Sequence, residues 1–277
     1  MVVTRFKWGT GRRMALKVAL SAAAAVGVMA GSALPASADT VVGAPFTWSG
    51  KTWCPTFRAG NGCDNLQQSG SQSDVPFDPA QVSESDDQST ISLNMNSDAT
   101  ASGAFNTQTY ETFSAPATIS EQLTLPCDAN GNIENWPAFW LVTTGTWPQG
   151  GEIDIAEGLH GKVAWHYHYL NAAGVNSQWG AYPTGFSGCG THTYEVIWNS
   201  SALTFIYDGV QVGQVTSAQI GVPIATGPMY LINDYAASSL YGGPTTGGVS
   251  MQVSNLNSYV LSNPPPTWWG SNGPRKH

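Results

Sequence analysis

One short stretch, residues 150–158, constrains the fold most, because it places three carboxylates among apolar residues. Its sequence is Gly-Gly-Glu-Ile-Asp-Ile-Ala-Glu-Gly, and the Ile and Ala between the acids favour a strand with a buried face. Side chains alternate along a strand, so Glu152 and Asp154 share one face and Glu157 points to the other. A β-bulge near Ala156 adds one residue and would bring all three acids to one face.

Three carboxylates in one row suit acid–base chemistry on an acetal. Like charges at close range raise one another's pKa, most for the group in the driest surroundings, so such a row can hold a proton at neutral pH. Two carboxyls about 5–5.5 Å apart, one ionised and one protonated, serve a retaining glycosidase as nucleophile and acid. Asp154 would orient Glu152 and keep the proton off it. The same pattern also fits surface acids on an exposed strand, or a calcium loop.

Motifs on both sides of the acids add a family resemblance. They are Trp-Pro-Ala-Phe-Trp-Leu at 136–141, Trp-Pro at 147–148, His-Thr-Tyr at 192–194 and Phe-Ile-Tyr-Asp-Gly at 205–209. In this order the set resembles glycoside hydrolase family 16, the laminarinase and β-glucanase family. The resemblance implies Glu152 as nucleophile, Asp154 as its assistant and Glu157 as acid/base. It also implies a β-jelly roll and the bulged form of the motif that is typical of β-1,3-glucan-cleaving branches.

Two segments depart from the family pattern. Residues 251–259 lack the usual Asp-Tyr-Val-Arg ending of the last strand, and residues 113–125 lack the usual Gly-Arg-x-Glu-x-Arg pattern. Arginines that would position neighbouring groups are therefore missing. The chain is expected to be a distant member, and substrate specificity is the property that the resemblance determines least.

The first 38 residues have the features of a signal peptide. Basic residues up to Lys17 precede an apolar run at 18–34, and Ala-Ser-Ala at 36–38 supplies a cleavage site. We expect cleavage after Ala38 and a secreted, extracellular protein. Arg12-Arg13 resembles a twin-arginine signal, although a general secretory signal fits nearly as well. A permanent membrane anchor is disfavoured because the run is short and weakly hydrophobic.

Export would change the charge balance. Removing residues 1–38 leaves five basic residues against 18 acidic ones, a net charge of −13 compared with −8 for the full chain. Such a chain has no basic surface for nucleic acid or anionic lipid, and it repels sulfated or uronate-rich polysaccharides. The expected partner is a neutral polysaccharide, with no nucleic acid and no membrane, and the protein is expected to be a monomer.

The mature chain is predicted to be all-β. Its apolar segments are short, β-branched or aromatic, and bounded by Gly, Pro, Asn or Ser. The pattern predicts two stacked antiparallel sheets, one curved into a concave substrate cleft, which the resemblance makes a β-jelly-roll sandwich. Residues 39–261 would form the catalytic domain and residues 262–277 a tail containing Pro and Trp. The expected strands are Thr90–Asn94, Gly103–Thr107, Ala117–Leu123, Ala138–Val142, Glu152–Ile155, Lys162–Tyr169, Thr193–Asn199, Leu203–Tyr207, Met229–Asn233 and Met251–Val260.

Four cysteines follow the signal peptide, an even number that suits an oxidising compartment. Three pairings are possible. Cys54 and Cys63 enclose a short loop and form the natural local pair, which leaves Cys127 with Cys189. Neither Cys-x-x-Cys spacing nor neighbouring histidines favour zinc, so two disulfide bonds are expected.

Candidate substrate-binding residues lie around the acids. Trp147 sits in a Pro/Gly turn before the catalytic strand, and indole rings stack on pyranose faces; Trp136 is a second candidate. His166 and His168 share one face of the next strand and could bond to the acids or to sugar hydroxyls, and His168 aligns with a histidine of laminarinase-like members. The pair Asn233–Asp234 is a weaker candidate.

No metal or other cofactor is expected in the reaction. The His-x-His pattern beside carboxylates can be half of a metal site, but catalysis already explains the acids. The family often carries a structural calcium on its convex side, for which this sequence shows no local motif.

The leading hypothesis is therefore a secreted, endo-acting retaining glycoside hydrolase that cleaves a neutral β-glucan with β-1,3 or mixed β-1,3/1,4 linkages by double displacement. A galactan or agar hydrolase, or a transglycosylase, could use the same three acids. The alternative from another class is a non-catalytic glycan-binding lectin on the same fold. Crowded carboxylates argue against the lectin, because a binding protein has no use for their electrostatic cost.

Overall fold

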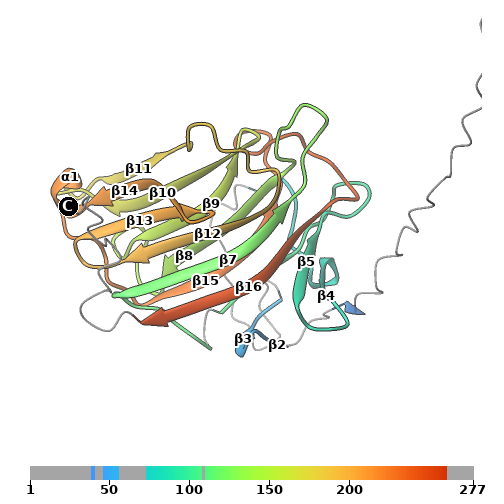
Figure 1. The fold of residues 1–277 in the computed structure, drawn as a ribbon, viewed down its shortest axis with the longest axis horizontal. Coiled ribbons are helices and arrows are strands. Elements are labelled where there is room, and N and C mark those ends of the chain that lie inside the picture. The colour runs from blue at the N-terminus through green and yellow to red at the C-terminus, as the bar shows by residue number, and fades with distance from the viewer. Residues whose placement is uncertain (1–38, 41–45, 56–72, 108–109, 261–277) are drawn as a thin grey trace, which may run out of the picture. The chain divides into compact units, whose positions relative to one another are not determined.

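The computed structural model describes residues 39–40, 46–55, 73–107 and 110–260 (Figure 1). The predicted signal peptide, the tail at 262–277 and Cys63 lie outside these residues. Within the described part, no helix is long and apolar enough to cross a membrane.

Two antiparallel sheets make up the fold (Figure 1). The larger sheet has eight strands, in the order β1 (Asp39–Thr40), β4 (Val82–Glu84), β5 (Thr90–Asn94), β16 (Ser250–Val260), β7 (Ala117–Leu125), β12 (Gly190–Trp198), β13 (Ala202–Tyr207) and β14 (Val210–Thr216). The smaller sheet has six, in the order β11 (Asn176–Ala181), β10 (Lys162–Leu170), β9 (Glu152–Leu159), β8 (Trp136–Thr143), β15 (Met229–Ala236) and β6 (Ala104–Asn106). Strands β2 (Phe46–Trp48) and β3 (Lys51–Trp53) form a hairpin, and the helical elements are η1 (Pro79–Gln81) and α1 (Ser217–Ile220).

The predicted all-β sandwich is confirmed, and each of the ten expected strands is present. The short strands β1 to β4 and the edge strands β11 and β14 were not expected. β11 is polar and largely exposed, so it has no buried face to leave an alternating apolar pattern.

The main core lies between the two sheets. Strands β7 and β12 contribute Ile119, Leu123 and Val196, all almost completely buried. Trp165 on β10 of the opposite sheet stacks on Phe205 of β13, the neighbour of β12, with ring centroids 4.5 Å apart. Burial of each such large side chain contributes roughly 1.5–3 kcal/mol to folding, so this layer holds the sheets together.

A polar pair interrupts this apolar layer. Glu121 occupies a core-facing position of β7 and Asn233 one of β15, and both are fully buried. Asn233 Nδ2 donates a hydrogen bond of 3.2 Å to Glu121 Oε1. The prediction that Asn233 lines the cleft is therefore wrong: its side chain points to the opposite side of β15, across the sandwich to the other sheet.

A disulfide bond joins Cys127 and Cys189, as predicted, with their Cα atoms 5.6 Å apart. It links the chain just after β7 to the chain just before β12. The pairing of Cys54 with Cys63 stays a prediction. Cys54 is described and fully buried, but Cys63 lies outside the described residues.

Candidate active site

Strand β9 contains the predicted β-bulge. Next to β8, Ala156 pairs with Phe139 and Asp154 with Trp140, so Ile155 has no partner. On the other side, Glu157 pairs with Ala164 of β10 and Asp154 pairs with His166. Ile155 and Ala156 therefore face a single residue of β10 between these two pairs. One residue is therefore inserted in β9 relative to both neighbours.

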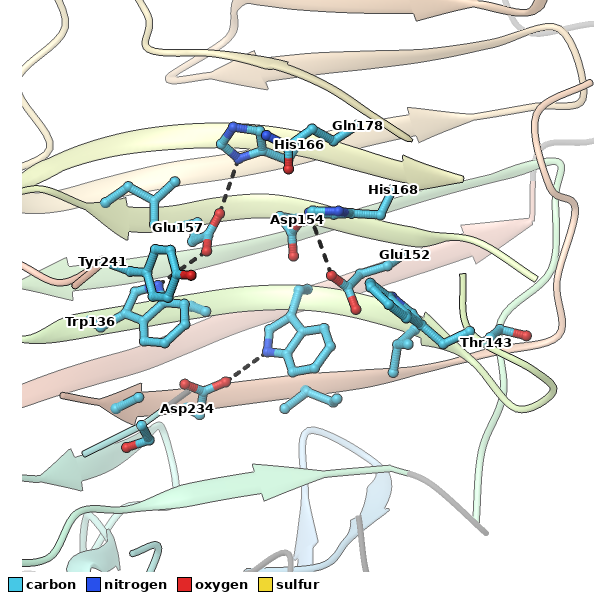
Figure 2. Close-up of a pocket in the computed structure, with 18 of the residues that line it drawn as sticks. Trp136, Thr143, Glu152, Asp154, Glu157, His166, His168, Gln178, Asp234 and Tyr241 are labelled. Carbon is cyan, nitrogen blue, oxygen red and sulfur yellow. Dashed lines mark hydrogen bonds and ion pairs between the residues drawn. The ribbon is translucent and has the colours of Figure 1, made fainter. Parts of the chain in front are cut away.

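Because of the bulge, the apolar side chains of β9 lie on one face of the strand and its three acids on the other. Ile153, Ile155 and Ala156 are buried in the core between the sheets. Glu152, Asp154 and Glu157 instead point together into a cavity on the outer, concave face of the six-stranded sheet (Figure 2). An oxygen of each flanking glutamate lies within 4.8 Å of an Asp154 oxygen.

A tyrosine from the opposite sheet holds the bulge in place. The hydroxyl of Tyr207 on β13 lies 2.7 Å from the carbonyl oxygen of Ile155 and 3.2 Å from that of Ala164. A bulge leaves a backbone group without its ladder partner, and a buried carbonyl without a donor is costly. Tyr207 therefore supplies the hydrogen bond that the disrupted ladder lacks.

The cavity has a volume of about 910 Å³, enough for several sugar units in an open cleft. Its walls come from β8, β9, β10, β11 and β15 and from the loops at 143–147 and 182 and around 241. Neither lysine nor arginine lines it within the described part of the chain. The imidazoles of His160, His166 and His168 are the groups in these walls that can carry a positive charge.

Glu157 has one partner on each oxygen (Figure 2). Trp136 Nε1 donates to Oε1 at 3.1 Å, and His166 Nδ1 lies 3.0 Å from Oε2. The side chains of Glu157 and His166 are each 13% exposed. The predicted acid/base is thus held in one orientation while it still faces the cleft.

Glu152 and Asp154 share a second imidazole. His168 Nε2 lies 3.7 Å from Glu152 Oε1 and 3.3 Å from Asp154 Oδ2. Although it is close to this ring, the buried Oδ2 of Asp154 accepts no hydrogen bond of suitable geometry. The row of acids therefore faces a matching row of two imidazoles on β10.

The two neighbouring carboxyls compete for one proton. Burial, then the charge of Asp154, raise the pKa of Glu152 to about 8, against the lowering effects of His168 and of a hydrogen bond from Trp147. Burial and then the charge of Glu157 raise the pKa of Asp154 well above its usual value. The side chain of Asp154 is the more buried, 7% exposed against 17% for Glu152. We therefore place the proton on Asp154, which leaves Glu152 ionised beside His168.

The predicted aromatic residues flank the acids. Trp147 is 47% exposed, and its ring centroid lies 6.2 Å from that of His168. Trp136 contacts Tyr241 from a later loop, with ring centroids 5.5 Å apart. The four cleft residues predicted as sugar contacts, the two tryptophans and the two histidines, all line the cavity.

Asp234, the second member of the weaker candidate pair, does line the cavity. Trp140, which was not predicted, donates a hydrogen bond of 2.7 Å from Nε1 to Asp234 Oδ2, and burial raises the pKa of Asp234 to about 7. Three further lining residues were not predicted either. Gln178, Tyr182 and Tyr241 come from the edge strand and from loops. Loop residues carry no periodic pattern, so only the proximity of these segments in the fold reveals them.

Two groups of possible metal ligands occur in the described residues, and both lie in the cleft: Glu152, Asp154 and His168, and Asp154, Glu157 and His166. Neither is on the convex side, where members of the family often carry a structural calcium. The sequence made no prediction of calcium there, and the described residues do not test it.

A comparison with protein-family models decides the classification. The model of the glycosyl hydrolases family 16 matches residues 69–248, more than half of the chain. The chain belongs to this family. It is accordingly an O-glycosyl hydrolase, and the three acids of β9 lie inside the matched region. Among curated protein sequences, none matched this family 16 chain.

Solved structures show the same fold. A glycoside hydrolase family 16 endo-glucanase from Bacteroides ovatus is 22% identical with a TM-score of 0.58, over 80% of this chain and 99% of that one. An endo-β-1,3-glucanase from Pyrococcus furiosus is 20% identical with a TM-score of 0.57, over 78% and 97% of the chains. A chain described with endo-acting O-glycanases of the human gut microbiota is 17% identical with a TM-score of 0.57, over 80% and 89%.

Proposed function

We propose that this chain is a secreted, endo-acting retaining hydrolase of a neutral β-glucan with β-1,3 or mixed β-1,3/1,4 linkages. The observation that carries the proposal is the bulge in β9, which brings Glu152, Asp154 and Glu157 to one face of an open cleft. Two of the similar structures are an endo-glucanase and an endo-β-1,3-glucanase, which supports β-glucan as the substrate class.

The reaction would run in two steps. In the first, Glu157 gives a proton to the glycosidic oxygen while the ionised Glu152 attacks the anomeric carbon and forms a glycosyl-enzyme. In the second, Glu157 takes a proton from a water molecule, which releases the sugar from Glu152 with net retention. Protonated Asp154 donates a hydrogen bond that orients Glu152. No cofactor enters either step.

The surroundings of the acids support these roles. Glu152 is the acid nearest to Trp147, a residue exposed enough for a sugar ring to stack on it. Glu157 is fixed by two hydrogen-bond partners and faces the other half of the cleft. An open cleft, in place of a closed pocket, suits attack within a long chain.

The substrate class is tested with laminarin, lichenan, agarose, xyloglucan and a galactan, by counting new reducing ends. We expect cleavage of laminarin, lichenan or both. Cleavage of agarose or the galactan alone would replace the β-glucan proposal with a galactan hydrolase. Binding without cleavage of any polymer would replace it with a lectin.

The mechanism is tested with Glu157→Ala on a 2,4-dinitrophenyl β-glycoside, whose leaving group needs no protonation, in the presence of azide. We expect rescued turnover and a β-glycosyl azide, because azide attacks the glycosyl-enzyme and needs no general base. An α-glycosyl azide would show inversion and contradict the proposal. Asp86→Asn, which changes an exposed acid in the turn between β4 and β5, is the matched control and should behave as the unchanged protein.

A further inference from the structure

The proposed mechanism leaves open where the proton of Glu157 is held before the reaction. Trp136 Nε1 donates to Oε1, and an indole nitrogen can only donate. A proton on Oε1 would face that N–H. The acid form of Glu157 therefore carries its proton on Oε2.

Oε2 is the oxygen that faces His166. At the observed 3.0 Å between Oε2 and Nδ1, one hydrogen fits between the two atoms. With a second hydrogen on Nε2, the pair holds one transferable proton, either as a carboxylic acid that donates to the neutral ring or as an imidazolium that donates to a carboxylate. The two side chains are equally shielded from water, which favours a shared proton over exchange with solvent.

The fold makes room for this ring. His166 lies opposite Gly180 in the pairing of β10 with β11. A Cβ atom on Gly180 would overlap Cδ2 of His166 and also the carbonyl oxygen of Trp165, although the backbone there needs no glycine for its conformation. An edge-strand glycine thus allows the imidazole to lie flat beside Glu157.

The charges around the pair explain why a group that can be protonated is needed there. Asp154 faces it from β9, Asp234 from β15, His168 from β10 and Tyr182 from the loop after β11. Neither lysine nor arginine lines the cleft in the described residues. His166 is therefore the group in contact with Glu157 that can carry a positive charge among these acids.

We propose that Glu157 and His166 form one acid–base unit that keeps the catalytic proton between Oε2 and Nδ1. His166 is a positioning residue that acts through Glu157 and does not touch the sugar. On substrate binding the proton on Oε2 turns away from Nδ1 and toward the glycosidic oxygen. It moves from Oε2 to that oxygen while the bond from the oxygen to the anomeric carbon breaks. Glu152 bonds to the anomeric carbon in the same step. In the second step Oε2 recovers one proton from water, and the hydroxide part of that water replaces Glu152. The inference rests on the proposed function.

The test is His166→Asn, which retains a hydrogen-bonding group beside Glu157 but cannot hold the proton. Rates are measured on a cleaved polysaccharide and on a 2,4-dinitrophenyl β-glycoside, whose leaving group needs no protonation. We expect kcat on the polysaccharide to fall about 100-fold, the typical contribution of general acid catalysis. The bond-breaking step on the dinitrophenyl glycoside should change less than about threefold, because it does not use the proton. The basic limb of the kcat/KM profile on the polysaccharide should move to lower pH.

Two further variants separate this role from a structural one. Gly180→Ala adds a methyl group that meets both the His166 ring and the Trp165 carbonyl, so it displaces the ring without removing it and should show the same dependence on the leaving group. His192→Asn removes another imidazole–carboxylate pair outside the cleft, in which His192 on β12 lies 2.7 Å from Asp208 in the turn after β13, and it should leave both rates unchanged. If His166→Asn lowers the rates on both substrates equally, or lowers neither rate, the inference is overturned. An unchanged protein that cleaves neither substrate would instead overturn the proposed function.

Discussion

The buried pair of Glu121 and Asn233 makes a quantitative prediction about stability. Burial raises the pKa of Glu121 from 4.5 to about 8, partly offset by the hydrogen bond from Asn233. With Glu121 ionised, two buried oxygens of the pair, Glu121 Oε2 and Asn233 Oδ1, have no hydrogen-bond donor. A proton on Oε2 would let it donate to Oδ1 and would satisfy both atoms.

The sign of the pH effect follows from the direction of the shift. A carboxyl whose pKa is raised in the folded state contributes stability that is fully present below its unfolded pKa and is lost as the pH rises through its folded pKa. Between pH 4.5 and about 8, the free energy of unfolding should therefore fall by about 5 kcal/mol, at about 1.4 kcal/mol for each pKa unit. This is a large share of the roughly 5–15 kcal/mol that stabilises a typical domain.

Glu121→Gln tests this reasoning. Its amide can accept from Asn233 Nδ2 and donate to Asn233 Oδ1, so it should reproduce the neutral acid without a titrating group. Urea unfolding at pH 5 and pH 8 gives the free energies. We expect the variant to match the unchanged protein within about 1 kcal/mol at pH 5 and to exceed it by several kcal/mol at pH 8.

The cleft acids also have raised pKa values, so they too lower the stability as the pH rises. Comparison of Glu121→Gln with the unchanged protein at each pH cancels their contribution, because both proteins contain them. Asp86→Asn is the control for loss of one negative charge at an exposed site. If both proteins lose the same stability between pH 5 and pH 8, Glu121 is ionised in the fold and the argument fails.

Four further predictions concern single contacts. Asp154→Asn keeps a donor toward the nucleophile and should lose less than about tenfold in kcat, whereas Asp154→Ala should lose at least about 100-fold; similar losses would contradict a protonated Asp154. Trp147→Ala should raise KM about 5- to 30-fold through the loss of roughly 1–2 kcal/mol of ring contact, and Trp147→Phe should retain most of it. Replacing Cys127 and Cys189 by serine should lower stability by about 2–4 kcal/mol, measured by thermal unfolding against the unchanged protein. Tyr207→Phe leaves two buried carbonyls without their donor and should cost about 1–3 kcal/mol in urea unfolding; an unchanged midpoint would show that the bulge needs no such support.

The bulged strand β9 could be predicted because its constraint is local. Strand parity and the spacing of the acids require one inserted residue, and the bulge lies at Ile155 and Ala156, next to where it was expected. The pairing of Cys127 with Cys189 followed from the short loop between the other two cysteines. Both inferences needed only neighbouring residues and simple geometry.

The errors arose where both faces of a strand are buried. Every residue of β15 is buried, so its sequence has no alternation that shows which face meets the cleft. Asn233 was therefore placed on the wrong side, while its neighbour Asp234 does line the cleft. The hydrogen bond from Tyr207 to Ile155 joins residues from opposite sheets, and only the folded chain brings them together.

The insertion in β9 has a consequence for related chains. Without Ala156, the acids would follow one another at every second residue, and a regular strand would carry them on one face with an unbroken ladder. The extra residue is thus not needed to orient the acids; it fixes how far apart two of them stand and how sharply the sheet bends beneath the substrate. The number of residues between the second and third acid in a sequence therefore indicates whether the strand under the cleft is regular or bulged, before any coordinates are known.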